Sequence, residues 1–264
     1  MTQEYEFKAE IQKLLDILSK SLYTHKEVFL RELISNSTDA LKKIHFISLK
    51  DKNIVDPDAE LRIDIFLDEE EGTITIKDTG VGMTQEELIE NLGTIASSGS
   101  QKFLEALEKR KEEKTELDLD IIGQFGIGFY SVFMVAKTVK VYSKSYKKDA
   151  PAYVWESDGS GNFTLEPCDK EDRGTEIVIE LQKDDQEYVQ KYRIESIIKK
   201  YSNFVPYPIY VYEVEEIEEV EEEEEVEEAE IVEEEEEGET KEEEKGEEEE
   251  EEEKEPEPVN EVRP

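Results

Sequence analysis

The sequence has 264 residues, enough for one substantial domain or two small ones. Its formal net charge of −40 comes from 32 Lys and Arg against 72 Asp and Glu, so it lacks the basic surface that proteins use to bind nucleic-acid backbones. Cys168 is the only cysteine, which excludes an internal disulfide framework and a cysteine-based zinc site. Because the sequence has no apolar run of membrane-spanning length and no signal-like N-terminus, we expect a cytoplasmic protein that does not interact with membranes.

The negative charge is concentrated at the C-terminal end of the chain. From Glu213 to Pro264 there are 32 Glu, 3 Lys and 1 Arg, a net charge of −28 that leaves −12 for residues 1–212. A low-complexity stretch of like charges cannot bury enough apolar surface to offset its chain entropy. We therefore predict a folded domain over residues 1–212 and an acidic, disordered linker over residues 213–264. A solubilising tail and a spacer to a further domain both fit this composition.

The predicted elements begin with two amphipathic helices, at 7–18 and 26–48, whose apolar residues recur at helical spacing. Residues 60–78 alternate apolar and polar residues around a glycine-containing turn, which indicates a β-hairpin. Thr84, followed three residues later by Glu87, forms a capping box that starts a short helix over 84–92. The elements expected after these are strands at 137–146, 151–156, 174–181 and 208–213, and a helix at 185–203.

Strands and helices come in blocks instead of alternating strictly along the chain. Blocks of this kind favour an α+β fold over a doubly wound parallel sheet. We predict a two-layer α/β sandwich with helices on one face of a mostly antiparallel sheet.

The helix predicted at 26–48 carries an unusual polar stripe, in which Glu32, Asn36 and Asp39 lie at positions i, i+4 and i+7. Asparagine in mid-helix costs stability because its side chain competes for backbone hydrogen bonds. The stripe therefore suggests a function, although an ordinary solvated helix face is the alternative. The apolar stripe beside it consists of Phe29, Leu33, Ala40, Ile44 and Ile47.

In the segment TITIKDTGVGM, a strand leads to Asp78 and a turn that contains Gly80 and Gly82. Glycines allow a flat ring to approach the backbone closely, and Met83 can pack on that ring. The Asp78 carboxylate can accept a hydrogen bond from an exocyclic amine, which suits adenine, whereas a guanine oxygen would face the carboxylate lone pairs. Taken alone, the segment is more simply explained as an ordinary Asp-led turn.

A third segment, IIGQFGIGFYS at 121–131, places Gly123, Gly126 and Gly128 before an apolar stretch that we predict to be helical. A helix N-terminus presents backbone N–H groups and a positive dipole end to an anion. The segment lacks the Lys-Ser or Lys-Thr pair of a P-loop, and its glycine spacing differs from the dinucleotide-binding fingerprint. By itself it is weak support for a phosphate site.

Five segments together resemble, in order and approximate spacing, the N-terminal ATP-binding domain of the heat-shock protein 90 chaperones: RELISNSTDAL, DTGVGM, GTIASSGS, IGQFGIGFYS and DRGTEI. The resemblance covers residues 5–212, and the Glu-rich tail is similar to the charged linker that leads to a middle domain in many members. It implies a Bergerat-type fold and a stress-response chaperone that binds ATP or ADP with Mg²⁺ and hydrolyses ATP in a conformational cycle. It also implies that the protein binds unfolded or partly folded client proteins, that the full-length protein is a homodimer, and that co-chaperones are possible partners.

The resemblance assigns roles to individual residues. Glu32 resembles the general base that activates the attacking water, and Asn36 resembles the protein ligand to Mg²⁺. Asp78 matches the carboxylate that recognises adenine, with Thr175 supporting it through water. Residues 93–125 correspond to a mobile lid. The other nucleotide-binding positions that the resemblance implies are Asp39, Lys43, Gly82, Met83, Asn91, Leu92, Gly123, Gly126, Ile127, Gly128 and Phe129.

The resemblance also implies how phosphate charge is met without a P-loop lysine. Mg²⁺ on Asn36 and the N–H groups of residues 123–129 take part of that charge, and an arginine from the following domain completes the site. We therefore expect this chain to bind ATP but to turn it over slowly. Ser97 stands where members commonly carry a basic residue, which leaves its effect on lid closure open.

The same helix and turn occur in a wider ATPase superfamily that includes MutL-type mismatch-repair proteins, type II topoisomerases and sensor histidine kinases. The kinases are disfavoured because their catalytic domain generally lacks an equivalent of Glu32. The DNA-acting members are disfavoured by the acidic charge. A non-enzymatic acidic scaffold for basic proteins such as histones would leave the five segments unexplained.

Overall fold

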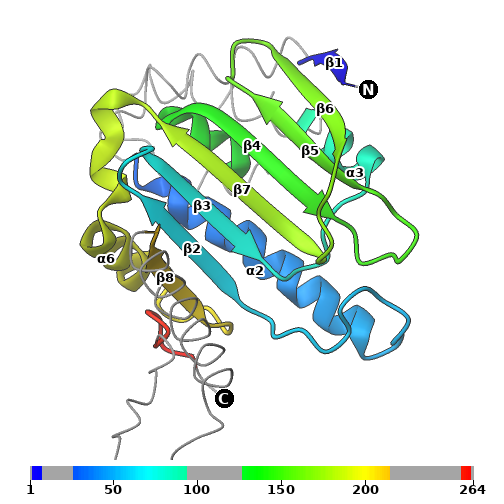
Figure 1. Cartoon of the computed structure of the whole chain (residues 1–264). Helices are drawn as coiled ribbons and strands as arrows, with labels where there is room; N and C mark the ends of the chain where they lie inside the picture. The colour runs from blue at the N-terminus through cyan, green and yellow to red at the C-terminus, as the bar shows by residue number, and fades with distance from the viewer. Residues whose placement is uncertain (1, 8–25, 94–126, 215–256, 263–264) are drawn as a thin grey trace, which may run out of the picture.

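The computed structural model of the chain describes residues 2–7, 26–93, 127–214 and 257–262 (Figure 1). Several predictions lie outside these residues. They concern the helix beyond Phe7, the lid beyond Gly93 with Ser97, the glycines Gly123 and Gly126, and the linker over 215–256.

An eight-stranded sheet in the order β1-β6-β5-β4-β7-β3-β2-β8 forms one layer. Every neighbouring pair is antiparallel except β2 and β8, which are parallel. The strands are β1 (Gln3–Glu6), β2 (Ile63–Asp68), β3 (Thr73–Asp78), β4 (Ala136–Lys144), β5 (Ala152–Ser157), β6 (Asn162–Cys168), β7 (Gly174–Leu181) and β8 (Ile209–Glu213).

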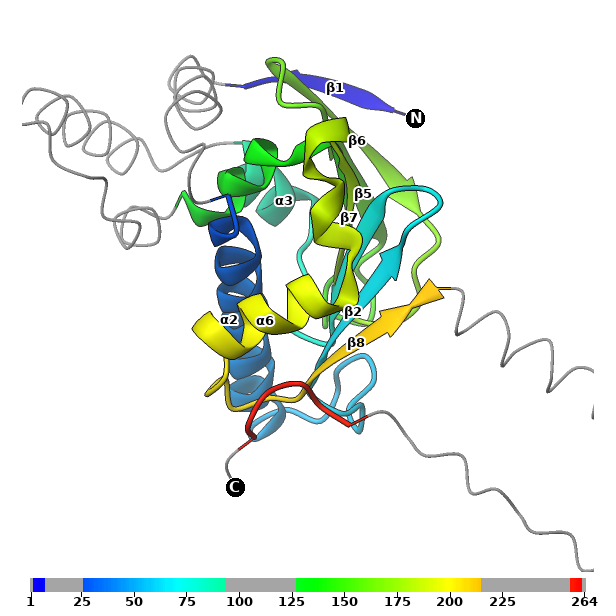
Figure 2. The same ribbon diagram turned by 90° about the vertical axis from the view of Figure 1, so that its left-hand side faces the viewer.

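The second layer is helical, and Figure 2 shows α2, α3 and α6 together on one side of the sheet. The hydrophobic core lies between the two layers, with Phe29, Tyr130 and Trp155 among its largest fully buried side chains. This arrangement confirms the predicted α+β sandwich. The helical elements are α2 (Val28–Ser48), α3 (Gln85–Gly93), α6 (Lys191–Tyr201) and the 3₁₀ helices η1 (Gly128–Met134) and η2 (Lys183–Val189).

The long helix α2 buries much of the stripe predicted for it, but not all. Phe29, Leu33 and Ile44 are buried, whereas Ala40 and Ile47 are only half-buried. These two side chains line the cavity described below, so an apolar stripe on this helix serves both the core and a binding site. The core face is completed by Val28, Leu30, Ile34 and Leu41.

The predicted hairpin at 60–78 is confirmed as β2 and β3, which pair with Ile65 opposite Ile76. Strands β1 and β6 were not predicted, because β1 is a four-residue polar segment and β6 contains Pro167. Their pairing joins Gln3 to Leu165, far apart in the sequence, so no local pattern could reveal it.

Two predicted helices differ from the observed ones. The helix expected at 185–203 is divided into η2 and α6, because Gln190 between them has extended backbone angles, φ −76° and ψ 120°. The helix expected after Gly128 is the 3₁₀ helix η1, whose residues are all buried. The apolar segment predicted to be helical thus forms a 3₁₀ helix that packs tightly on α2. None of the described helices combines the length and apolar character needed to cross a bilayer.

Residues 257–262 return to the domain and lie beside the start of β8, as the red segment in Figures 1 and 2 shows. Asn260 is 5 % exposed, accepts a hydrogen bond from the Ile209 N–H (2.9 Å) and donates to the carbonyls of Val205 (3.0 Å) and Tyr207 (2.9 Å). The Val259 N–H donates to the Ile209 carbonyl (2.8 Å). We call residues 257–262 the edge clip, because they bond to the first residue of the edge strand β8 and to the loop before it.

The edge clip differs from the linker expected over 213–264. Its sequence EPVNEV breaks the glutamate run with an asparagine and two valines. The polar Asn260 side chain bonds main-chain groups at the start of β8 and in the loop before it. Glu213 likewise belongs to β8. For residues 215–256 the linker stays a prediction.

Asn260→Ala is expected to release the edge clip, because it removes the side chain that satisfies one N–H and two C=O groups of the main chain. Amide hydrogen exchange should show faster exchange of the Ile209 N–H by about ten- to a hundredfold, in line with about 1–3 kcal/mol for unpaired groups. Glu261→Ala is the matched control, since the Glu261 side chain is exposed. Unchanged exchange at Ile209 in the Asn260 variant would contradict this role for the clip.

Candidate functional site

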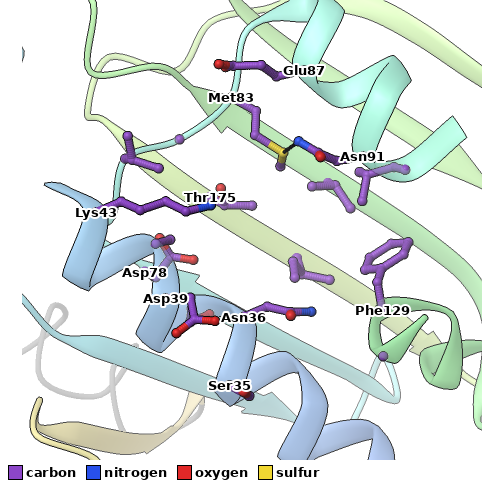
Figure 3. A pocket seen from close by; sticks show the side chains of 18 of the residues that line it. Ser35, Asn36, Asp39, Lys43, Asp78, Met83, Glu87, Asn91, Phe129 and Thr175 are labelled. Atoms are coloured by element: carbon purple, nitrogen blue, oxygen red, sulfur yellow. Dashed lines mark hydrogen bonds between the residues drawn. The ribbon is translucent and has the colours of Figure 1, made fainter. Parts of the chain in front are cut away.

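A cavity of about 780 Å³ opens between α2 and the sheet (Figure 3). Its size lies within the range of small-molecule sites. It brings together α2, the turn after β3, α3, the start of η1 and the ends of β4 and β7. The residues predicted from sequence that line it are Glu32, Asn36, Asp39, Lys43, Asp78, Gly82, Met83, Asn91, Leu92, Gly128, Phe129 and Thr175.

Of the predicted site residues that the structure describes, Ile127 is the one that does not line the cavity. Ile127 is fully buried in the core, where its side chain packs instead of facing the cavity. Gly123 and Gly126 lie outside the described residues. Only residues 127–129 of the anion site expected over 123–129 are described, and the anion site stays a prediction.

Asp78 ends β3 and is 4 % exposed. Its burial raises the pKa to about 6, although hydrogen bonds from the Gly80 N–H (2.9 Å), the Ser37 side chain and the Thr175 backbone favour the charged form. The carboxylate is therefore mostly ionised at neutral pH. A buried carboxylate facing a cavity is an acceptor for a hydrogen-bond donor of the ligand.

The turn after Asp78 is held on both sides by main-chain hydrogen bonds. The Val81 N–H donates to the Ala40 carbonyl of α2 (3.2 Å), and the Tyr146 N–H donates to the Val81 carbonyl (2.9 Å). Gly82 has φ +58°, and a Cβ there would come within 1.8 Å of the Lys144 carbonyl oxygen. Only glycine fits this close approach, so the turn presents its backbone to the cavity in one fixed conformation.

Helix α3 begins at the predicted capping box. The Thr84 N–H donates to Glu87 Oε2 (2.8 Å), and the Glu87 N–H donates to Thr84 Oγ1 (3.4 Å). The helix directs Asn91 into the cavity, where its amide Nδ2 contacts Met83 Sδ at 3.7 Å, drawn as a dashed line in Figure 3. Met83 and Asn91 thus form one wall of the cavity.

Glu32 lies on the first turns of α2 and is 7 % exposed. Its Oε1 accepts hydrogen bonds from the neighbouring Arg31, from Nε at 3.0 Å and from Nη2 at 2.8 Å. A Cβ on Gly128 would come within 2.4 Å of Glu32 Oε2, so the absence of a side chain at Gly128 lets η1 approach this carboxylate. One oxygen of Glu32 is paired with Arg31, and the other lies where α2 meets η1.

Asn36, Asp39 and Lys43 are exposed residues of α2 that line the cavity (Figure 3). The described residues contain no group of three or more His, Cys, Asp or Glu that could hold a metal. A divalent cation here would need further oxygen ligands, from phosphate or water, beside those that the protein supplies. The Asn36 amide oxygen suits Mg²⁺, a hard cation that commonly keeps waters and phosphate oxygens in its shell.

Sequence reasoning missed several residues of the cavity wall. Val141 and Ile177 lie on its floor, but apolar residues of a strand look the same in sequence whether they face a core or a ligand. Ser37 could have been found as the small polar residue next to Asn36. The other lining residues not predicted are Ser35, Ala40, Phe46, Ile47, Val81, Glu87 and Tyr146.

Comparison with known proteins agrees with this geometry. The profile described as "Histidine kinase-, DNA gyrase B-, and HSP90-like ATPase" matches residues 23–175, and the profile "Hsp90 protein" matches residues 187–263. Chaperone protein HtpG of Chlorobium chlorochromatii is 52 % identical over 211 residues, 80 % of this chain and 33 % of the relative. HtpG of Desulfitobacterium hafniense is 49 % identical over 208 residues, 79 % of this chain and 33 % of the relative.

A eukaryotic relative, the mitochondrial heat shock protein 75 kDa of Rattus norvegicus, is 49 % identical over 208 residues, 79 % of this chain and 28 % of the relative. The chain thus spans about a third of the length of the curated relatives it matches. Fold, cavity and similarity agree: the chain belongs to the histidine kinase-, DNA gyrase B- and HSP90-like ATPases, and within them it contains the N-terminal ATPase domain of the Hsp90 family.

Proposed function

We propose that the chain binds ATP and ADP with Mg²⁺ in the cavity and hydrolyses ATP to drive the conformational cycle of a molecular chaperone. The observation that carries the proposal is that four groups line one cavity. The buried carboxylate of Asp78 lies beside the turn at Gly82, which packs closely on the Lys144 main chain, and Glu32 and Asn36 are on α2. These groups come from distant parts of the sequence and have complementary tasks in nucleotide chemistry.

The base end of the site is formed by Asp78, Met83 and Thr175. An ionised Asp78 accepts a hydrogen bond from the adenine amine, and the flat ring lies against the turn, whose conformation is fixed where Gly82 packs on the Lys144 main chain. The thioether of Met83, held beside Asn91, packs against the ring. This arrangement favours adenine over guanine.

The phosphate end is formed by residues of α2 and η1. Asn36 would hold Mg²⁺ through its amide oxygen, and the ion neutralises charge on the phosphates when it is bound. Glu32 acts as the general base that orients and deprotonates the attacking water through Oε2, while Arg31 restrains Oε1. Such positioning, together with charge stabilisation, accounts for most of the catalysis in phosphoryl transfer.

The names of the relatives support the wider role. Curated relatives are named chaperone protein HtpG and heat shock protein, which favours an ATP-driven chaperone over a DNA-acting ATPase. The proposal therefore includes unfolded or partly folded client proteins, a homodimer of the full-length protein, co-chaperones and a cytoplasmic location. It also includes slow turnover by this chain alone, because an arginine of the following domain completes the site.

Calorimetric titration with ATP, ADP and GTP, each with and without Mg²⁺, tests the proposal. We expect ATP and ADP to bind, GTP to bind at least about tenfold more weakly, and Mg²⁺ to strengthen ATP binding, since one lost charged hydrogen bond already accounts for about that factor. Asn36→Ala should remove most of the Mg²⁺ effect, whereas Asn53→Ala, in the loop after α2, should not. If no nucleotide binds, the acidic scaffold is favoured instead.

A further inference from the structure

Ser143 is a fully buried residue of β4 whose hydroxyl connects two walls of the cavity without facing the cavity itself. Its Oγ accepts a hydrogen bond from the Met83 N–H at 2.9 Å and lies 3.1 Å from Oγ1 of Thr175. Antiparallel pairing of β4 and β7 places Ser143 directly opposite Thr175. A single oxygen atom therefore joins the turn after β3 to the residue that stands beside Asp78.

The hydroxyl of Ser143 has one proton to donate, and two acceptors are in reach. One is Oγ1 of Thr175 at 3.1 Å, and the other is the Gly174 carbonyl at 3.4 Å. The shorter distance favours donation to Thr175. No other hydrogen bond to Oγ1 of Thr175 is found among the described residues, so its own proton is then free to point into the cavity.

The direction of this hydrogen bond decides what the cavity can recognise. If Ser143 donates to Thr175, the wall offers an acceptor, Asp78, next to a donor, Thr175, since these two residues pair across β3 and β7. If instead Ser143 donated to Gly174, Thr175 would donate to Ser143 and offer the cavity only lone pairs. Adenine presents an amine donor beside the acceptor nitrogen N1, whereas guanine presents a carbonyl acceptor beside an N–H donor.

We propose that Ser143 is a positioning residue for base recognition: it fixes the Met83 main chain and makes the Thr175 hydroxyl a donor beside the Asp78 acceptor. This inference rests on the proposed function, because it concerns how the same site selects adenine. The donor reaches the ring nitrogen directly or through one water, and both routes need the same proton direction. Ser143 thus shapes specificity without touching the ligand.

The test compares the binding of ATP and 1-deaza-ATP, which lacks the acceptor nitrogen N1 but keeps the amine. Calorimetry is done on the unsubstituted chain, Ser143→Ala, Thr175→Val and the double variant. We expect Ser143→Ala to weaken ATP binding about five- to tenfold, the range for a lost neutral hydrogen bond, and to weaken 1-deaza-ATP binding clearly less. In the Thr175→Val background, Ser143→Ala should weaken both nucleotides equally, since only the Met83 contact is then lost.

Ser157→Ala is the matched control, because the Ser157 hydroxyl also accepts a main-chain N–H, from Gly159 at 3.1 Å, and donates to a carbonyl, of Asn162 at 2.6 Å. It lies on β5 outside the cavity wall and should leave the ratio of the two affinities unchanged. Ser143→Thr keeps a hydroxyl and should retain the preference for ATP over 1-deaza-ATP. Thermal denaturation of each variant verifies that it is folded.

The outcomes separate this inference from the proposed function. If the unsubstituted chain binds no ATP, the proposed function fails first. If it binds ATP and Ser143→Ala weakens ATP and 1-deaza-ATP by the same factor, Ser143 has only a structural role and the inference is overturned. The inference is also overturned if the effects of Ser143→Ala and Thr175→Val on ATP binding are additive, because residues acting through one hydrogen bond must be coupled.

Discussion

Glu32→Ala is expected to lower the rate of ATP hydrolysis by at least about 100-fold, the contribution of a positioned general base, while changing ATP affinity by less than about threefold. The reason is geometric: Glu32 lies where α2 meets Gly128 of η1, away from the base end at Asp78. Hydrolysis is measured by single-turnover phosphate release, in this chain and in a chain extended by the region that follows it in full-length relatives. Affinity is measured by calorimetry on the same samples.

Glu180→Ala is the control, because it removes the same charge as Glu32→Ala at a residue that does not line the cavity. Glu180 lies on β7 in an exposed ion pair with Lys137. Such surface pairs contribute little to stability. Turnover by Glu32→Ala within about threefold of the unsubstituted enzyme, in the extended chain, would refute the assignment of the general base. A loss of both binding and hydrolysis would instead assign Glu32 a structural role.

Asp78→Asn is expected to weaken ATP binding about ten- to a hundredfold, because a hydrogen bond to a charged acceptor contributes about 1.5–3 kcal/mol. ADP should lose affinity by the same factor, since the change concerns the base and not the phosphates. Calorimetric titration of both nucleotides measures this. Asp64→Asn is the control, a second buried aspartate of the sheet that does not line the cavity.

The pH dependence gives a second measurement on the same carboxylate. Because burial raises the pKa of Asp78 to about 6, its charge is present at pH 7 and lost as the pH falls through about 6. The affinity for ADP should therefore fall below pH 6 relative to the profile of Asp78→Asn, which supplies the baseline for titration of the phosphates. Identical profiles, or unchanged affinity in the variant at pH 7, would mean that Asp78 does not read the base.

The raised pKa of Asp78 also affects the stability of the ligand-free domain, and here ionisation is unfavourable. A carboxyl whose pKa is higher in the folded than in the unfolded state adds stability at pH values below its unfolded pKa, and that stability is lost as the pH rises through about 6. At neutral pH the ionised Asp78 is thus a cost to the fold. A ligand that donates to it offsets that cost.

Much of the fold could be predicted from sequence because its signals are local. The helix α2, the hairpin of β2 and β3 and the capping box of Thr84 and Glu87 each follow from spacing within about 20 residues. The strands β1 and β6 could not be found in this way, because a short polar strand and a proline-containing strand are stabilised by pairing with distant partners. The 3₁₀ form of η1 depends on its packing against α2, which no window of sequence contains.

The cavity was predicted in a similar, partial way. Polar residues out of place in their elements, such as Asn36 in mid-helix and Asp78 before two glycines, suggested a function, but most individual site positions came from the resemblance to the heat-shock protein 90 chaperones. Its apolar floor at Val141 and Ile177, and the buried hydroxyl of Ser143, gave no signal because strand residues of these types normally serve the core. Their part in the site depends on which strands lie beside one another.

The edge clip affects how the length of the glutamate run can change in evolution. Residues 257–262 are fastened at Ile209, the first residue of β8, so their position is set by Asn260 and not by the number of glutamates in between. Lengthening such a closed segment is thermodynamically cheap, at about 0.6 kcal/mol for each doubling. Expansion or contraction of the glutamate run can therefore proceed without displacing the edge clip.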